Sequence, residues 1–78
     1  EDYVPLFPQV IALTDNDVRI IKENYQKALK IDDRQVVSKL STKIKEILKL
    51  EIDPTKMTER QFINVVIKDY NFYTGKDL

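Results

Sequence analysis

Apolar residues recur every three or four positions in three stretches of the chain, which is the spacing of amphipathic α-helices. A single glycine among 78 residues argues against a turn-rich β fold. We therefore predict an all-α domain, a small three-helix bundle with helices over about 14–30, 33–50 and 58–74. The side chains expected to face its core are Val18, Ile21, Tyr25, Ala28 and Leu29 in the first helix, Val36, Val37, Leu40, Ile44, Ile47 and Leu48 in the second, and Phe62, Ile63, Val66, Ile67, Tyr70 and Tyr73 in the third.

Residues at the ends of these stretches agree with the predicted limits. Residues of N-cap type precede each helix: Thr14 or Asp15, Asp32 or Asp33, and Thr58. The sequence "TERQ" is typical of a capping box, in which Thr58 and Gln61 bond each other's backbone N–H groups. Gly75 can supply the left-handed residue that ends the last helix.

The first thirteen residues form an apolar arm without a helical period. Val4 and Phe7 each precede a proline, which favours extended backbone, although Pro8 could open a short helical turn. We expect the arm, residues 1–13, to pack across a helical domain over 14–78, or to dock on a partner or on a second copy. Because the chain starts at Glu1 without a methionine, we expect it to be a fragment of a larger protein.

Three apolar residues of the helices lie outside the core-facing stripes. Val65 and Phe72 share a second line on the third helix, and Ile20 lies opposite the stripe of the first. A three-helix bundle covers one face of each helix, so the arm or another molecule must cover these residues. Together with Leu6 and Phe7 of the arm they are our interface candidates. The pattern favours a non-enzymatic protein–protein interaction or self-association module, whose partner is another protein or a second copy.

Composition removes most chemistries from consideration. The chain has no histidine and no cysteine, which excludes ordinary zinc sites and nucleophiles activated by imidazole. The stretch after Asp53 has Thr58 and Asn64 where a calcium loop needs glycine and glutamate. "IKEILKLEIDPTKMT" resembles the first helix and loop of acyl and peptidyl carrier proteins, but no serine follows it to hold phosphopantetheine. We predict no enzyme activity, no metal and no cofactor, and interpret residues 51–58 as a connector.

The charge balance favours neither membrane nor nucleic acid overall, since 13 basic residues face 13 acidic ones. No apolar run is long enough to span a bilayer, and no signal peptide is recognisable. We therefore expect no membrane association and an intracellular location, cytoplasmic or nuclear.

The alternative function is a small helical nucleic-acid-binding domain. Residues 27–49 hold seven basic and three acidic residues, a local net charge of +4. The predicted helix 33–50, or the polar side of helix 58–74, could then lie along phosphates. The candidates are Lys39, Lys43, Lys45, Lys49, Arg60 and Lys68. The basic residues of helix 33–50 spread around its solvent side and no aromatics alternate with them, so we prefer a protein partner.

Overall fold

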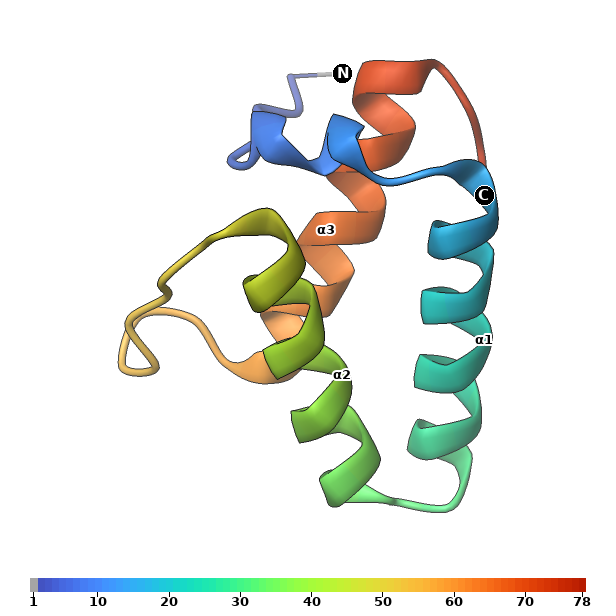
Figure 1. Ribbon diagram of the computed structural model, residues 1–78, viewed down its shortest axis with the longest axis vertical. Coiled ribbons are helices and arrows are strands. Elements are labelled where there is room, and N and C mark those ends of the chain that lie inside the picture. The colour runs from blue at the N-terminus through green and yellow to red at the C-terminus, as the bar shows by residue number, and fades with distance from the viewer. Residues whose placement is uncertain (1) are drawn as a thin grey trace.

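The computed structural model describes residues 2–78 and contains three α-helices preceded by a 3-10 turn (Figure 1). The elements are η1 (Pro8–Ala12), α1 (Asp15–Lys30), α2 (Arg34–Leu48) and α3 (Glu59–Thr74). The prediction of an all-α three-helix bundle with a short-helical arm is confirmed. No helix limit differs from its predicted position by more than two residues.

The capping residues explain where the helices begin. Thr14 and Asp17 form a capping box at α1, and Thr58 and Gln61 form the predicted one at α3. The Asp33 side chain caps α2 by accepting a hydrogen bond from the backbone N–H of Val36 at 3.1 Å. Each cap satisfies N–H groups that have no partner inside the helix.

Left-handed residues end two of the helices. Gly75 ends α3 with a φ of 67°, as predicted. The second helix was expected to reach Leu50, but it ends at Leu48 because Lys49 takes a left-handed conformation with a φ of 56°. The N–H of Leu50 then bonds the carbonyl of Lys45 at 2.9 Å, which satisfies a carbonyl of the last turn.

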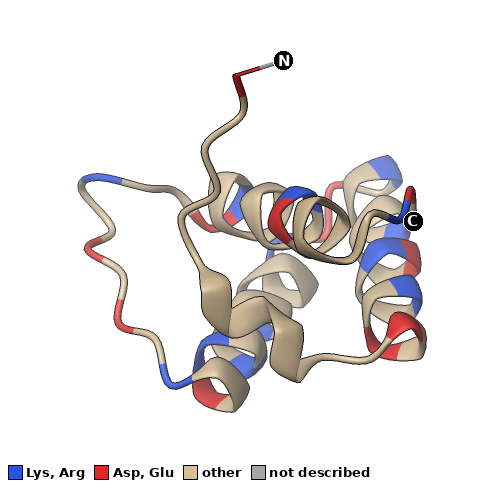
Figure 2. Cartoon of the chain, turned by 90° about the horizontal axis from the view of Figure 1, so that it is seen from above, with Lys and Arg blue, Asp and Glu red and all other residues tan. Residues whose placement is uncertain are grey.

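The third helix packs against every other element of the bundle. α1 and α2 form an antiparallel pair, and α3 packs against both of them and against η1 (Figure 1). Phe62, Ile63 and Val66 of α3 are fully buried, together with Val10 of η1 and Val18 of α1. Seen from above, the arm runs down to η1, which then leads into α1 (Figure 2). The arm thus completes the core of its own chain.

Four residues expected in the core are exposed: Leu29, Val36, Ile47 and Tyr73. Leu29 and Val36 lie beside the connection between α1 and α2, in the last turn of α1 and the first turn of α2 (Figure 1). Tyr73 lies in the last turn of α3 and stacks edge-on against Phe72. Ile47 borders a hollow between α1 and α2. Helical periodicity places these residues on the inner side of each helix, but it does not show how far the neighbouring helices extend.

Residues 49–58 connect α2 to α3, as the sequence indicated. Leu50, Ile52 and Met57 pack partly buried against the core. The Asp53 carboxylate accepts hydrogen bonds from the backbone N–H and the hydroxyl of Thr55, at 2.9 and 2.7 Å. These bonds lower the pKa of Asp53 below its ordinary value and close a turn of the Asx type. Within residues 2–78, no helix combines the length and apolar character needed to cross a bilayer.

Candidate protein-interaction surface

The arm is attached to α3 through a buried carboxylate. Asp69 is fully buried, and its oxygens accept hydrogen bonds from the Tyr3 hydroxyl and from the backbone N–H groups of Leu6 and Phe7, the last two at 2.9 and 2.7 Å. A buried carboxylate needs such partners, because burial without them is costly. The arm therefore packs on its own chain.

The sequence contained a signal for this anchor. Asp69 lies one helical turn after Val66 and just before Tyr70, and both of these residues are buried. An acidic residue within the apolar stripe of a helix requires buried donors. Helical spacing alone does not identify which segment supplies them, so the sequence analysis passed over this residue.

Tyr3 is held in its protonated form by this arrangement. Burial, the hydrogen bond to Asp69 and the negative charge of that carboxylate raise the pKa of the Tyr3 phenol to about 12. The Lys68 ammonium lies 4.9 Å from the centre of the Tyr3 ring, at a distance typical of cation–π contacts. At neutral pH the phenol therefore stays protonated and donates a hydrogen bond to Asp69.

Four of the five interface candidates lie on the arm or on α3, and the fold uses part of their surface. The Phe7 ring packs edge-on against Phe62 with centroids 5.5 Å apart, and the Phe72 ring lies 6.0 Å from that of Tyr3. Phe7 and Val65 are half-buried, whereas Leu6 and Phe72 keep 55% and 52% of their surface exposed.

The fifth candidate, Ile20, lies on a different face of the molecule. The sequence allowed the arm to cover it, but η1 packs on α3 and α2 and not on α1. Ile20 is 48% exposed and lines a hollow of about 270 Å³ between α1 and α2, opposite Ile47, which is 53% exposed. The candidates thus divide between two faces and do not form one site.

A second hollow adjoins the first at Ile47. It is lined by Pro8, Ile11 and Ala12 of η1 and by the end of α2. Ile11 is 64% exposed, so three elements each contribute an exposed isoleucine. We call Ile11, Ile20 and Ile47 the isoleucine surface. The sequence analysis found only Ile20, because it placed Ile11 in the arm and Ile47 in the core.

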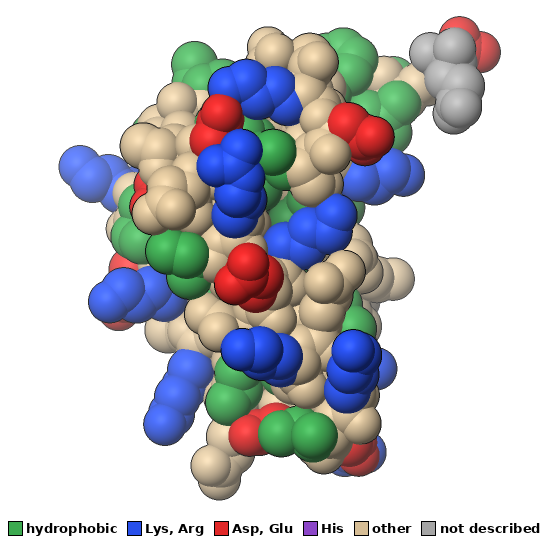
Figure 3. Space-filling model, turned by 90° about the vertical axis from the view of Figure 1, so that its right-hand side faces the viewer, with side chains coloured by type: hydrophobic (Ala, Val, Ile, Leu, Met, Phe, Trp, Pro, Cys, Tyr) green, Lys and Arg blue, Asp and Glu red, His purple; other side chains and the backbone are tan. Residues whose placement is uncertain are grey.

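Four of the six basic candidates lie on α2 and its C-cap, and the other two lie on α3. Lys45 lies over the Phe62 ring at 5.4 Å, Lys68 lies over Tyr3, and Arg60 approaches Asp32 at 3.5 Å. The remaining ones, Lys39, Lys43 and Lys49, make no ion pair within residues 2–78. Figure 3 shows the α1 side of the molecule, on which basic and acidic side chains are interspersed. Nucleic-acid binding remains a prediction.

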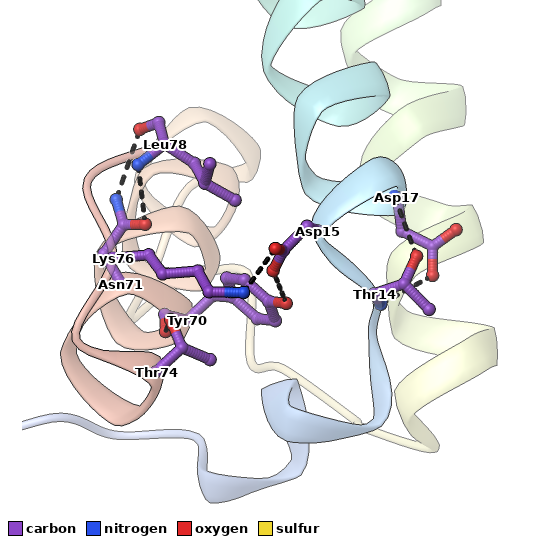
Figure 4. A network of polar contacts seen from close by, with 8 residues as sticks. All are labelled: Thr14, Asp15, Asp17, Tyr70, Asn71, Thr74, Lys76 and Leu78. Atoms are coloured by element: carbon purple, nitrogen blue, oxygen red, sulfur yellow. Dashed lines mark hydrogen bonds and ion pairs between the residues drawn. The ribbon is translucent and has the colours of Figure 1, made fainter.

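Asp15, at the start of α1, has a structural role. Asp15 accepts hydrogen bonds from the Lys76 ammonium and the Tyr70 hydroxyl (Figure 4). Both bonds lower the pKa of Asp15, and the bond from Lys76 has the larger effect. Asn71 exchanges two hydrogen bonds with the backbone of Leu78, at 3.2 and 3.0 Å. These contacts attach the last residues to α1 and α3.

Among residues 2–78 no three histidine, cysteine or acidic side chains are grouped to hold a metal.

Comparison with known proteins gives a family for the chain. None of the curated proteins and none of the solved structures matches it. A family model does match, over residues 1–78, which is the full length of the sequence. The chain therefore belongs to the family described as "Domain of unknown function (DUF8484)".

Proposed function

We propose that this domain is a non-enzymatic protein–protein interaction module that binds through the isoleucine surface. The observation that carries the proposal is the convergence of exposed Ile11, Ile20 and Ile47 from η1, α1 and α2 around two adjoining hollows. Single exposed apolar residues are common, but apolar residues grouped around a concave surface are typical of binding sites.

The isoleucine surface is a better binding site than the arm. The backbone of Leu6 is bonded to Asp69, and the Phe72 ring of α3 packs against the Tyr3 ring of the arm. A partner there would compete with contacts of the fold. Around Ile20 and Ile47, the buried apolar side chains of α1 and α2 form a floor, and no other segment of residues 2–78 covers it.

The experiment compares Ile47→Glu with a matched control, Ile31→Glu. Ile31 is 74% exposed and follows the last turn of α1, whereas Ile47 lies in the last turn of α2. Both substitutions therefore remove an exposed isoleucine and place a negative charge near a helix C-terminus, so their effects through the helix dipole are similar.

Each variant is immobilised and used for affinity purification. The retained proteins, which include any copies of the chain itself, are quantified by mass spectrometry. We expect the wild type and Ile31→Glu to retain the same partner, and Ile47→Glu to retain at least tenfold less of it. The few residues that dominate an interface each contribute about 2 kcal/mol or more, and a loss of about 1.4 kcal/mol lowers affinity tenfold. Circular dichroism checks that both variants are folded. Equal retention by all three proteins would refute the proposed function.

A further inference from the structure

The hollow between α1 and α2 carries opposite charges on its two walls. Asp17 and Ile20 belong to the α1 wall, and Lys43 and Ile47 belong to the α2 wall. Neither Asp17 nor Lys43 forms an ion pair within residues 2–78. The surface thus has an apolar centre, an acid on one helix and a base on the other.

The hollow and its two charged walls are complementary to the same surface on a second copy of the chain. In a two-fold symmetric dimer the same patch of both chains meets, so it must supply both the protruding and the receiving parts. Ile20 and Ile47 protrude on either side of a concave floor, which provides both. The chain as a whole has a net charge of zero, so two copies do not repel each other at long range.

The antiparallel arrangement of α1 and α2 fixes how two copies would meet (Figure 1). If a two-fold axis runs parallel to the helices along the hollow, α1 of one copy packs on α2 of the other. The rotation does not change the height of any residue along the axis. Ile20 then faces the partner's α2 between Lys43 and Ile47, and Asp17 comes within a helical turn of Lys43, which a flexible lysine side chain can span. Because of the two-fold symmetry, each contact occurs two times in the dimer.

We propose that a second copy of this chain occupies the hollow, forming a two-fold dimer with α1 of each copy on α2 of the other. This inference rests on the proposed function and names its partner. The dimer buries the isoleucine pairs at its centre and sets Asp17 of each copy against Lys43 of the other at the edge.

The test uses charge reversal and sedimentation across a dilution series. Asp17→Lys alone, or Lys43→Glu alone, places like charges at both edge contacts and should weaken dimerisation about tenfold. A mixture of the two variants restores opposite charges at both contacts, because the lysine introduced in one copy meets the glutamate introduced in the other, and the unchanged Asp17 and Lys43 meet at the second contact. We expect the mixture to dimerise at least as strongly as the wild type.

Control variants separate this effect from the attraction of oppositely charged proteins. Glu51→Lys and Lys27→Glu change the net charge by the same amounts at exposed positions outside the hollow. These controls should dimerise alone as the wild type does. Circular dichroism shows that each variant is folded, which matters for Asp17→Lys because Asp17 belongs to the capping box of α1.

Two results would overturn the inference: a wild type that stays monomeric at every concentration, or a dimer that neither charge reversal nor Ile47→Glu weakens. If the wild type is monomeric but needs Ile47 to retain another protein, the dimer is refuted. The proposed function then still holds. Loss of both the dimer and the Ile47-dependent retention would refute both.

Discussion

The Tyr3 hydroxyl donates a hydrogen bond to the carboxylate of Asp69, sixty-six residues further along the chain. The same carboxylate accepts the backbone N–H groups of Leu6 and Phe7, so one side chain of α3 holds three positions of the arm. The position of the arm on α3 therefore depends on a polar contact inside an apolar environment.

Replacing Asp69 by alanine should release the arm. The change removes the acceptor of three hydrogen bonds and leaves two backbone N–H groups without a partner, which should lower the free energy of unfolding by about 3 kcal/mol. Denaturant unfolding measures this loss, and hydrogen exchange should accelerate at Leu6 and Phe7.

The control for Asp69→Ala is Glu23→Ala, which removes an exposed carboxylate in the middle of α1. It should change stability by less than about 0.5 kcal/mol. If both variants unfolded at the same denaturant concentration, the anchor would contribute nothing to stability.

Alkaline pH should weaken the same contact by ionising Tyr3. Since its pKa is raised to about 12 in the folded chain, the folded state keeps the proton more tightly than the unfolded state, in which a tyrosine titrates near pH 10. The stabilising contribution is complete below about pH 10 and is lost as the pH rises toward about 12.

The measurement for Tyr3 compares the pH dependence of unfolding in the wild type and in Tyr3→Phe. The difference between their unfolding free energies should shrink between about pH 10 and pH 12. The hydrogen bond to Asp15 raises the pKa of Tyr70 as well, so absorbance at alkaline pH should show one late-titrating tyrosine fewer in the variant than in the wild type. A constant difference across this range would mean that Tyr3 titrates normally.

Local signals explain why the helices were predictable. Caps such as Thr58 with Gln61, and Gly75, act within a few residues, so the sequence places the helix ends directly. The arm was harder to place, because its position depends on Asp69, and a residue's burial depends on elements distant in sequence. Ile47 shows the same limit, since it follows the core spacing of α2 and is exposed because no element within residues 2–78 covers the hollow beside α1.

Acid should break the contact between the start of α1 and the end of the chain. The hydrogen bonds from Lys76 and Tyr70 lower the pKa of Asp15, so the folded state releases this proton more readily than the unfolded state. The stabilising contribution is therefore present above the ordinary aspartate pKa of about 3.9 and is lost as the pH falls through the lower, folded-state pKa.

Asp15→Asn tests this contribution. Between pH 5 and pH 2 (a range of about three units around the ordinary pKa), the free energy of unfolding should fall less in the variant than in the wild type. Lys76→Gln should reduce the acid sensitivity in the same direction, since it removes the largest cause of the shift. Parallel curves for all three proteins would contradict the role of this contact.

Ser41 should be a site where the domain can be stabilised. It lies on α2 with no exposed surface, and its hydroxyl has no hydrogen-bond partner in the described part of the chain, residues 2–78. An unsatisfied buried hydroxyl lowers stability, and alanine removes it while favouring the helix, so Ser41→Ala should raise the free energy of unfolding by about 1 kcal/mol.

The matched control is Ser38→Ala, one turn earlier on α2. There the hydroxyl is half-buried and donates a hydrogen bond to Glu59 at 3.0 Å, so its removal costs a contact. The helix propensity gain is the same at both positions, and the difference between the two variants in denaturant unfolding therefore isolates the hydroxyl. Ser41→Ala should be the more stable of the two. The opposite order would mean that Ser41 makes a stabilising contact in solution, with a water molecule or with a carbonyl of its own helix.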